Sequence, residues 1–353
     1  MPDNRRILIT GNNGYIGSVM APWLQSQGYD VVGLDTDYFL SCRLLPDFAS
    51  IPTLRKDLRE VTASDLVGLD AVIHLAALSN DPIGNLNPHW TREINGEGTI
   101  RLAKFAKQAG VPRFIFSSSC IMYGMSEALA VDETSPLAPQ TEYARSKVDA
   151  EIALRQLADE RFSPTFCRNG TIYGLSPRMR FDTVLNNLMG SAFTTRRVVI
   201  HSDGTPWRPV VHVQDVARAF QAVIEAPLEI VHDQAFNVGA DELNHQVGEL
   251  GQIVKETVPG CELAMVRRPG ADQRTYKANF AKFKRTFPTF DFRWTARKGA
   301  EELHTAFQKI GLRDSQFTDK RFTRLNWLRH LLENGFVDES LRWTRLTAQV
   351  TAA

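Results

Sequence analysis

Short, mostly apolar runs alternate with amphipathic stretches through the first half of the chain. The apolar runs occupy residues 6–10, 31–35, 71–75 and 114–117, and each predicts a buried strand. Residues 91–109 have helical periodicity. Continuous apolar strands that alternate with helices indicate a parallel sheet covered on both faces.

The pattern changes after about residue 174. The segment 176–209 contains five arginines and is interrupted by proline, glycine and tryptophan; a shorter apolar run at 235–238 predicts one more strand, and helices follow. We predict one α/β domain over residues 1–174, with further parts of it after 174, and a smaller interleaved α/β domain mainly in residues 175–315. Residues 317–343, rich in Arg, Leu and Trp with acids interspersed, predict one or two amphipathic helices in a C-terminal extension, 316–353.

Composition narrows the class of protein. Hydrophobic residues make up 43% and charged residues 23% of the chain, as is usual for globular proteins. The formal net charge of +1 gives no overall field that would attract nucleic acid or an acidic membrane. Four cysteines without CxxC spacing argue against a zinc site and a disulfide framework. Since signal-peptide and membrane-span patterns are also missing, we expect no metal, no nucleic-acid or membrane partner, and a cytoplasmic location.

A glycine-rich turn joins the first predicted strand to the helix that follows. It reads GNNGYIG from Gly11 to Gly17, with Gly14 between them. This spacing lets the backbone approach a pyrophosphate, toward which the helix N-terminus directs free N–H groups. The next strand ends at Asp35, whose carboxylate can accept both hydroxyls of an adenosine ribose and would repel a 2′-phosphate. The pattern predicts a Rossmann-type doubly wound fold that binds NAD rather than NADP.

Two further polar residues belong to predicted strands. Asp57 follows a third strand, where it can meet the adenine edge or simply be a solvated carboxylate at a strand end; the sequence leaves both open. His74 lies within an apolar strand, where a histidine is more often a hydrogen-bonded core residue than a catalyst. We therefore assign His74 no role.

Three residues predict proton transfer. Tyr143 and Lys147 lie four apart in a predicted helix and so share one face, and Ser119 ends a strand upstream. Tyrosine ionises near pH ~10, but a nearby ammonium and a positively charged nicotinamide ring favour the phenolate. Ser119 can hydrogen-bond the same substrate hydroxyl. A Tyr–Lys pair alone would be an ordinary surface contact; with the glycine turn it predicts removal of a proton from an alcohol while a dinucleotide accepts the hydride.

With these motifs, the chain resembles the extended short-chain dehydrogenase/reductases of the nucleotide-sugar epimerase/dehydratase family. The resemblance extends over about residues 5–310. It implies that the N-terminal domain binds NAD, that the later part binds a nucleotide-diphosphate sugar, and that the chain forms a homodimer through the helices of residues 91–109 and 143–159. The matching motifs are GNNGYIG, Asp35, HLAA, NGEGT, SSSCIMYG, YARSK, RNGTIYG, RPVVHVQDVARA and RRPG.

The resemblance also assigns residues to the site. The catalytic residues are Ser119, Tyr143 and Lys147. The NAD-binding residues are Gly11, Asn13, Gly14, Tyr15, Ile16, Gly17, Asp35, Asp57, Leu58, Leu75, Ala76, Ala77, Asn95, Ser117, Tyr143 and Lys147. The substrate-binding residues are Asn80, Asp81, Ser119, Cys120, Thr171, Arg180, Arg208 and Arg268. Arg208 and Arg268 would bind the diphosphate, since a guanidinium can donate two parallel hydrogen bonds to phosphate.

The chain departs from the family pattern around the sugar. Dehydratases place an Asp–Glu pair directly after the catalytic Ser or Thr, whereas this chain has Cys120 and Ile121. Thr171 stands where the family has a sugar-contacting Asn, and Pro209 where Asp is usual. The loop around Gly84 is also altered, and its Asp81 is a possible extra acid or base, although an Asp before Pro is more often a turn residue.

We therefore predict an NAD-dependent nucleotide-sugar epimerase, which oxidises a sugar hydroxyl transiently to a ketone and then returns the hydride. A nucleotide-ketosugar reductase or a sugar dehydratase of the same family is the alternative. The intact Ser, Tyr and Lys argue against a non-enzymatic NAD-sensing or RNA-binding protein, as does the near-neutral charge.

Overall fold

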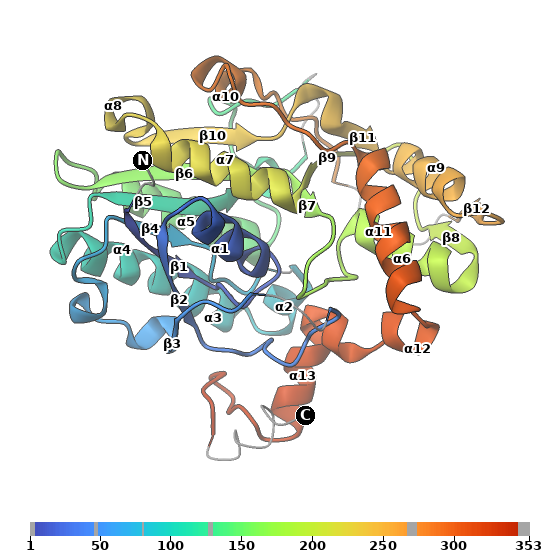
Figure 1. Cartoon of the computed structure of the whole chain (residues 1–353), viewed down its shortest axis with the longest axis horizontal. Helices are drawn as coiled ribbons and strands as arrows, with labels where there is room; N and C mark the ends of the chain where they lie inside the picture. The colour runs from blue at the N-terminus through green and yellow to red at the C-terminus, as the bar shows by residue number, and fades with distance from the viewer. Residues whose placement is uncertain (1–3, 46–48, 80, 126–129, 267–273, 345–353) are drawn as a thin grey trace.

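Seven parallel strands form the central sheet of the computed structural model, which describes residues 4–45, 49–79, 81–125, 130–266 and 274–344. The strand order is β3-β2-β1-β4-β5-β6-β10 (Figure 1). Its direction reverses between β1 and β4, which is the doubly wound arrangement that the sequence predicted. The strands are β1 (Arg6–Thr10), β2 (Asp30–Asp35), β3 (Thr53–Arg55), β4 (Ala71–His74), β5 (Arg113–Ser119), β6 (Ser163–Asn169) and β10 (Gln234–Val238).

Helices cover both faces of this sheet. Successive strand residues point to opposite faces, so Ile7 and Ile9 pack with α1 (Gly17–Ser26) and α7 (Val213–Glu225). Leu8 between them packs on the other side with α4 (Gly98–Gln108) and α5 (Glu142–Arg155). Burial on both faces explains why these strands are apolar without alternation. The helical periodicity of residues 91–109 corresponds to the π-helical turn η3 (Thr91–Glu97) followed by α4.

Strand β10 comes from the later half of the chain but belongs to the central sheet. It pairs in parallel with β6, with Phe236 opposite Cys167. Helix α7, also from the later half, packs beside α1. The chain therefore returns to the first sheet after residue 174, while the predicted domain boundaries themselves stay a prediction.

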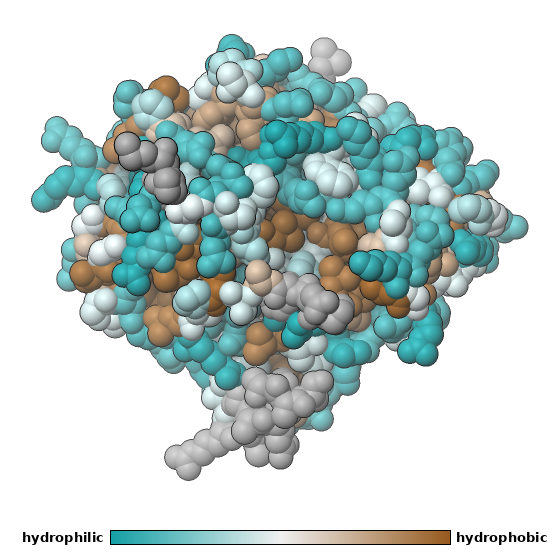
Figure 2. All heavy atoms as spheres, in the orientation of Figure 1, coloured by the Kyte–Doolittle hydropathy of each residue, from teal (hydrophilic) through white to brown (hydrophobic). Residues whose placement is uncertain are grey.

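A smaller α/β part has a separate hydrophobic core. Its three-stranded sheet has the order β11-β9-β7, and β12 pairs with β8. These strands are β7 (Thr171–Tyr173), β8 (Arg197–Ile200), β9 (Trp207–His212), β11 (Asn244–Gln246) and β12 (Glu262–Met265). Helices α6 (Val184–Thr195), α9 (Val247–Thr257) and α11 (Ala296–Ile310) pack around them, on the right in Figure 1. In the view of Figure 2, hydrophilic side chains cover most of the face and apolar ones gather toward its middle.

The described part of the C-terminal extension includes helical segments, while its predicted bounds stay a prediction. It contains α12 (Asp314–Phe317), the turn η6 (Lys320–Phe322) and α13 (Arg324–Glu333). Trp327, Leu328 and Leu331 of α13 share one apolar cluster with residues that follow β2 and β4. The extension is thus packed onto the body of the protein. Shorter helices complete the fold: α2 (Asp81–Leu86), α3 (Pro88–Trp90), η1 (Leu58–Glu60), η2 (Ala63–Leu66), η4 (Cys120–Tyr123), α8 (Leu228–Val231), η5 (Asp241–Leu243) and α10 (Ala281–Thr286).

Within the described residues, none of the helices combines the length and apolar character that crossing a bilayer requires.

Candidate active site

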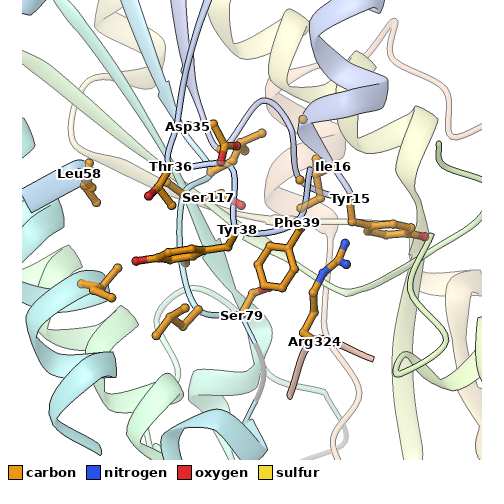
Figure 3. A pocket seen from close by; sticks show the side chains of 18 of the residues that line it. Tyr15, Ile16, Asp35, Thr36, Tyr38, Phe39, Leu58, Ser79, Ser117 and Arg324 are labelled. Atoms are coloured by element: carbon orange, nitrogen blue, oxygen red, sulfur yellow. The ribbon is translucent and has the colours of Figure 1, made fainter. Parts of the chain in front are cut away.

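A cavity follows the carboxyl edge of the central sheet, at the reversal between β1 and β4 (Figure 3). In open α/β sheets this crevice is where ligands bind. The segments after β1, β2, β3 and β4 line it, and side chains of β5, α5 and the later half of the chain complete the wall. The predicted site residues that line the cavity are Gly11, Gly14, Tyr15, Ile16, Gly17, Asp35, Asp57, Leu58, Leu75, Ala76, Ala77, Ser117, Tyr143, Lys147 and Arg180.

The glycine turn follows β1 and leads directly into α1. Gly11 has φ +74°, a left-handed conformation, and a Cβ there would lie 2.8 Å from the backbone nitrogen of Ala76. At Gly17 a Cβ would lie 2.3 Å from the carbonyl oxygen of Gly11. Only glycine therefore allows the turn to close against the segment after β4 and against itself. The N-terminal turn of α1 consequently borders the cavity, with Gly14, Tyr15, Ile16 and Gly17 among the lining residues.

Asp35 ends β2 at the edge of the cavity. One carboxylate oxygen accepts the backbone N–H of Asn13 at 2.9 Å, and the other accepts that of Asp37 at 2.8 Å. Burial raises the pKa of Asp35 to about 6, and the charge of Asp37 adds to this rise. The carboxylate is thus fixed in direction, and each oxygen still has a lone pair available for a ribose hydroxyl.

Asp57 lines the cavity at the end of the third strand. It caps η1 by accepting the N–H of Arg59 at 2.8 Å, and it forms an ion pair with the Arg59 guanidinium at 2.7 Å. Burial alone would raise the pKa of Asp57, but these contacts with Arg59 hold that pKa below its usual value. Asp57 is therefore an ionised, largely satisfied carboxylate at the cavity wall rather than a solvated one.

Tyr143 and Lys147 both reach the cavity from α5, and Ser117 reaches it from β5. The Lys147 ammonium donates to the carbonyl oxygen of Ser117 at 2.8 Å and lies 5.7 Å from the centre of the Tyr143 ring. Ser119 is two residues beyond Ser117 on the same strand and therefore faces the same side. Its hydroxyl accepts the N–H of Ile121 at 3.3 Å and caps η4.

The ionisation of this group differs from the expectation drawn from the sequence. Burial raises the pKa of Tyr143, the charge of Asp81 raises it further, and Arg180 is the cation that opposes the rise. Desolvation lowers the pKa of Lys147 to about 7. The predicted lowering of the Tyr143 pKa by Lys147 is thus not seen, because Lys147 is itself desolvated and turned toward the backbone of Ser117.

Two predicted cofactor residues hold the cavity wall in place but do not themselves line the cavity. Asn13 donates from its side chain to Asp37 at 2.7 Å, while its backbone holds Asp35. The Asn95 amide bonds both the N–H and the C=O of Leu78, at 2.8 and 3.1 Å, which fixes the segment after β4. His74 lies in the core, as predicted: its ring bonds two threonine hydroxyls, and burial lowers its pKa to about 3.

Two predicted substrate residues lie at or beside the reactive end of the cavity. Arg180 lines it, forms an ion pair with Asp182 at 2.8 Å and donates to the hydroxyl of Ser79 at 3.0 Å. Asp81 accepts the Thr141 hydroxyl at 2.7 Å and pairs with Arg274 at 2.7 Å. Asp81 begins helix α2, so the expected Asp–Pro turn is in fact the first turn of a helix.

Other predicted substrate residues do not line the cavity. Cys120 is fully buried among apolar side chains, and its thiol donates to the carbonyl oxygen of Arg168 at 3.1 Å, so its assignment as a sugar contact is corrected to a core role. Thr171 begins β7 in the small sheet. The Arg208 guanidinium donates to the backbone of Trp207 and Arg274. Asn80 and Arg268 lie outside the described residues.

Several lining residues were missed at the sequence level. Thr36, Tyr38 and Phe39 follow Asp35, and Arg324 begins α13. The first three could have been found by proximity to the strand end. Arg324 could not, because it is distant from every motif in the sequence and reaches the cavity only through the packing of the extension.

The residues present fit a dinucleotide. A Cβ at Gly11 or Gly17 would collide with the turn that borders the cavity, and the helix end behind the turn suits a diphosphate. Asp35 lies on one side of this turn, and Ser117, Tyr143 and Lys147 lie at the other end of the same cavity. The cavity therefore offers contacts to an adenosine ribose, a diphosphate and a reactive ring in the order in which NAD carries them.

Known proteins share both sequence and fold with the chain. Its sequence is 30% identical over 332 residues to the UDP-glucose 4-epimerase of Bacillus subtilis (strain 168), covering 84% of this chain and 94% of that protein. The structure of TunA, an NAD-dependent NDP-hexosamine 5,6-dehydratase involved in tunicamycin biosynthesis, superposes with a TM-score of 0.77 at 25% identity, covering 87% of this chain and 98% of TunA. MoeE5, solved with UDP-glucuronic acid and NAD, has a TM-score of 0.75 at 27% identity, covering 87% of this chain and 100% of MoeE5.

These relatives include an epimerase and a dehydratase, so they leave the reaction open within one family. A family model matches residues 7–239, from β1 to the residue after β10. The chain belongs to the NAD-dependent epimerase/dehydratase family, and its cofactor is NAD.

Proposed function

We propose that the chain is an epimerase of nucleotide-diphosphate sugars. The observation that carries the proposal is the meeting of Ser117, Tyr143 and Lys147 with the glycine turn and Asp35 in one cavity. This arrangement supports reversible oxidation of an alcohol.

When bound, NAD supplies the acceptor and donor of a hydride. Tyr143 would take the proton of a sugar hydroxyl at its Oη while the carbon gives up its hydride, which leaves a ketone. Tyr143 then returns the proton to the oxygen when the hydride comes back to the opposite face of the sugar. The product is an isomer of the substrate, and no cofactor is consumed.

The surrounding groups support these proton transfers. Arg180 places positive charge near the phenol, which opposes the effect of burial and favours the ionised form of Tyr143. Lys147 is held by the carbonyl oxygen of Ser117, so its position does not depend on the substrate. Ser119 faces the same side of β5 as Ser117 and can direct the sugar hydroxyl toward Tyr143.

Two positions favour epimerisation over dehydration. Elimination of water needs an acid and a base beside the sugar in addition to the tyrosine. Here Ile121 has no ionisable group, and burial raises the pKa of the Cys120 thiol, which points into the core. Asp81 is the acid beside Tyr143, and it is already bound to Thr141 and Arg274.

The test is a product analysis. The purified protein is incubated with a panel of UDP- and dTDP-sugars without added cofactor, each deuterated at the carbon under test, and the products are resolved by NMR. An epimerase returns the label to the same carbon with inverted configuration. A reductase requires added reduced cofactor, and a dehydratase yields a keto sugar that has lost water; either outcome contradicts the proposal.

Tyr143→Phe tests the assigned base in the same assay. It keeps the ring and its packing but removes the proton acceptor, so turnover should fall by about two or more orders of magnitude while NAD binding survives. The matched control is Tyr29→Phe, which removes a hydroxyl bonded to Glu225 on α7 and should leave turnover unchanged. Near-full activity of Tyr143→Phe would exclude Tyr143 as the base.

A further inference from the structure

Arg324 brings a buried positive charge to the cavity from the C-terminal extension. The residue is only 4% exposed and begins α13. Its Nη2 donates to the carbonyl oxygen of Arg178 at 3.0 Å, and its guanidinium lies 4.4 Å from the centre of the Phe39 ring. Its Nη1 has no hydrogen-bond partner among the described residues. A buried guanidinium nitrogen without an acceptor is costly unless a ligand completes it.

The direction of the side chain identifies the part of the cavity that it serves. Figure 3 shows the Arg324 guanidinium beside Phe39 and directed toward Tyr15 and Ile16 of the glycine turn. Arg324 lies close enough to both Asp35 and Arg180 to interact with them electrostatically. Asp35 marks the adenosine end of the cavity and Arg180 the reactive end, so Arg324 faces the section between them.

We propose that Arg324 is a ligand of the NAD diphosphate, so that the C-terminal extension forms part of the cofactor site. The proposal rests on the NAD dependence of the family and is independent of whether the reaction is an epimerisation. A diphosphate lying against the glycine turn offers oxygens to the free Nη1, and a guanidinium matches phosphate geometry with two parallel hydrogen bonds. The α1 N-terminus and Arg324 would then bind the diphosphate from opposite sides.

The electrostatics of the site agree with an anionic ligand. Burial lowers the pKa of Arg324 to about 10, and the nearby Arg180 adds to this effect. The closest carboxylates are already engaged: Asp182 pairs with Arg180 and accepts the backbone N–H of Arg324, and Asp35 holds two backbone N–H groups. An anion at Nη1 would supply the charge that these groups do not.

This chain is longer than the parts of it that align with two of its structural neighbours. The structural alignments include 98% of TunA and 100% of MoeE5, but only 87% of this chain in each case. About an eighth of this chain is therefore left unaligned in each comparison. A cofactor contact from the extension would be an addition to the dinucleotide site that the family shares.

The test measures NAD binding by calorimetry on protein freed of any co-purified cofactor. Arg324→Met removes the charge and keeps much of the side-chain volume, so the Kd for NAD should rise about 10- to 100-fold, as expected for losing a hydrogen bond to a charged group. Arg329→Met is the matched control, because Arg329 is exposed on the same helix; its Kd should not change. An unchanged NAD Kd for Arg324→Met would overturn the proposal.

Two further measurements separate a ligand role from a structural one. The melting temperature of the NAD-free protein should not fall in Arg324→Met, because the variant removes a buried charge that forms no ion pair with any described residue. A fall together with an equal loss of UDP affinity would mean that Arg324 only shapes the fold. UDP should bind both proteins equally, and weaker UDP binding with unchanged NAD binding would assign Arg324 to the substrate instead. If Arg324→Met does not fold, Arg324→Gln removes the charge but keeps a polar side chain, and a Kd for NAD equal to that of the wild type would then refute the assignment.

Discussion

At the scale of single residues, the cavity holds buried charges. Asp35 accepts two backbone N–H groups and forms no ion pair within the part of the chain that the structure describes, and its pKa of about 6 results from burial first and the charge of Asp37 second. Because this pKa is raised above the usual aspartate value of 3.8, ionising Asp35 costs stability; the cost is fully present above about pH 6 and absent below about pH 4. Such groups are typical of ligand sites, where the ligand supplies the missing partner.

The pKa of Asp35 predicts how NAD affinity depends on pH. Two ribose hydroxyls can each donate a hydrogen bond to one oxygen of an ionised carboxylate. In the protonated acid one of these oxygens carries a proton, so protonation of Asp35 should oppose NAD binding. With a pKa of about 6, affinity should be level above pH 7 and about tenfold lower at pH 5. Calorimetry at pH 7.5 and pH 5 measures this difference.

Asp35→Asn isolates this effect from other groups that titrate in the same range, among them Lys147 with its pKa of about 7. The variant should bind NAD weakly at both pH values and discriminate less against NADP, since the repulsion of the 2′-phosphate is removed. Asp30→Asn, at the exposed start of the same strand, should keep the wild-type profile. Equal affinity of the wild-type protein at the two pH values would contradict the assignment of Asp35.

The sequence predicted single residues well where their chemistry lies within one short motif. Gly11, Gly17, Tyr143 and Lys147 meet in the cavity because each pair is fixed by a turn or by one turn of helix. Cys120 shows the limit of this reasoning. It follows Ser119 directly, yet adjacent residues there point in different directions, and the thiol packs into the core instead of facing the sugar.

At the scale of elements, the cavity wall depends on contacts that no local pattern encodes. The loop after β2 is bound to the C-terminal extension by three hydrogen bonds: Trp327 donates to the carbonyl oxygen of Tyr38 at 2.6 Å, Tyr38 to that of Leu341, and Trp343 to that of Thr36. These partners are about 300 residues apart in the chain. The strands and long helices could be predicted from periodicity, but amphipathic periodicity in the extension says only that one face is buried, not against what.

Trp327→Ala should release the extension from this loop. The indole is 5% exposed, and its loss removes both a large apolar contact and the bond to Tyr38. Stability should fall by about 3–5 kcal/mol, NAD affinity should fall as well, and limited proteolysis should cleave near residues 311–323 while the remaining chain stays intact. Mass spectrometry of the digest identifies the fragment.

The matched control for this element is Trp294→Ala. Trp294 stacks on His212 at 3.9 Å and has no hydrogen bond to the extension among the described residues. It should destabilise the protein without exposing the 311–323 segment to protease. If Trp327→Ala leaves both the digestion pattern and the NAD affinity unchanged, the extension is not coupled to the cofactor site.

At the scale of the whole molecule, three parts of the chain meet around one cavity. The central sheet supplies the turn and the strand ends, residues after 174 supply Arg180, and the extension supplies Arg324. Because α13 contacts α2 and the loop after β2, the outer faces of α4 and α5 stay uncovered by it. In Figure 1, α4 lies at the left of the molecule and α13 at the bottom.

These outer faces are where the resemblance to the family predicts a homodimer. Arg145, Asp149 and Ile152 are exposed along one stripe of α5, and Ile152 is 53% exposed. In a two-fold interface the same stripe meets itself, so that basic and acidic positions can pair across the axis while the apolar one is buried.

Light scattering at micromolar concentration should therefore give twice the chain mass of 39.6 kDa. Ile152→Glu should shift the protein toward the monomer, because it buries two like charges near each other. Ile230→Glu, at a 43% exposed position on α8, should not. A wild-type monomer, or a dimer that Ile152→Glu leaves intact, would show that this pair of helices does not form the interface.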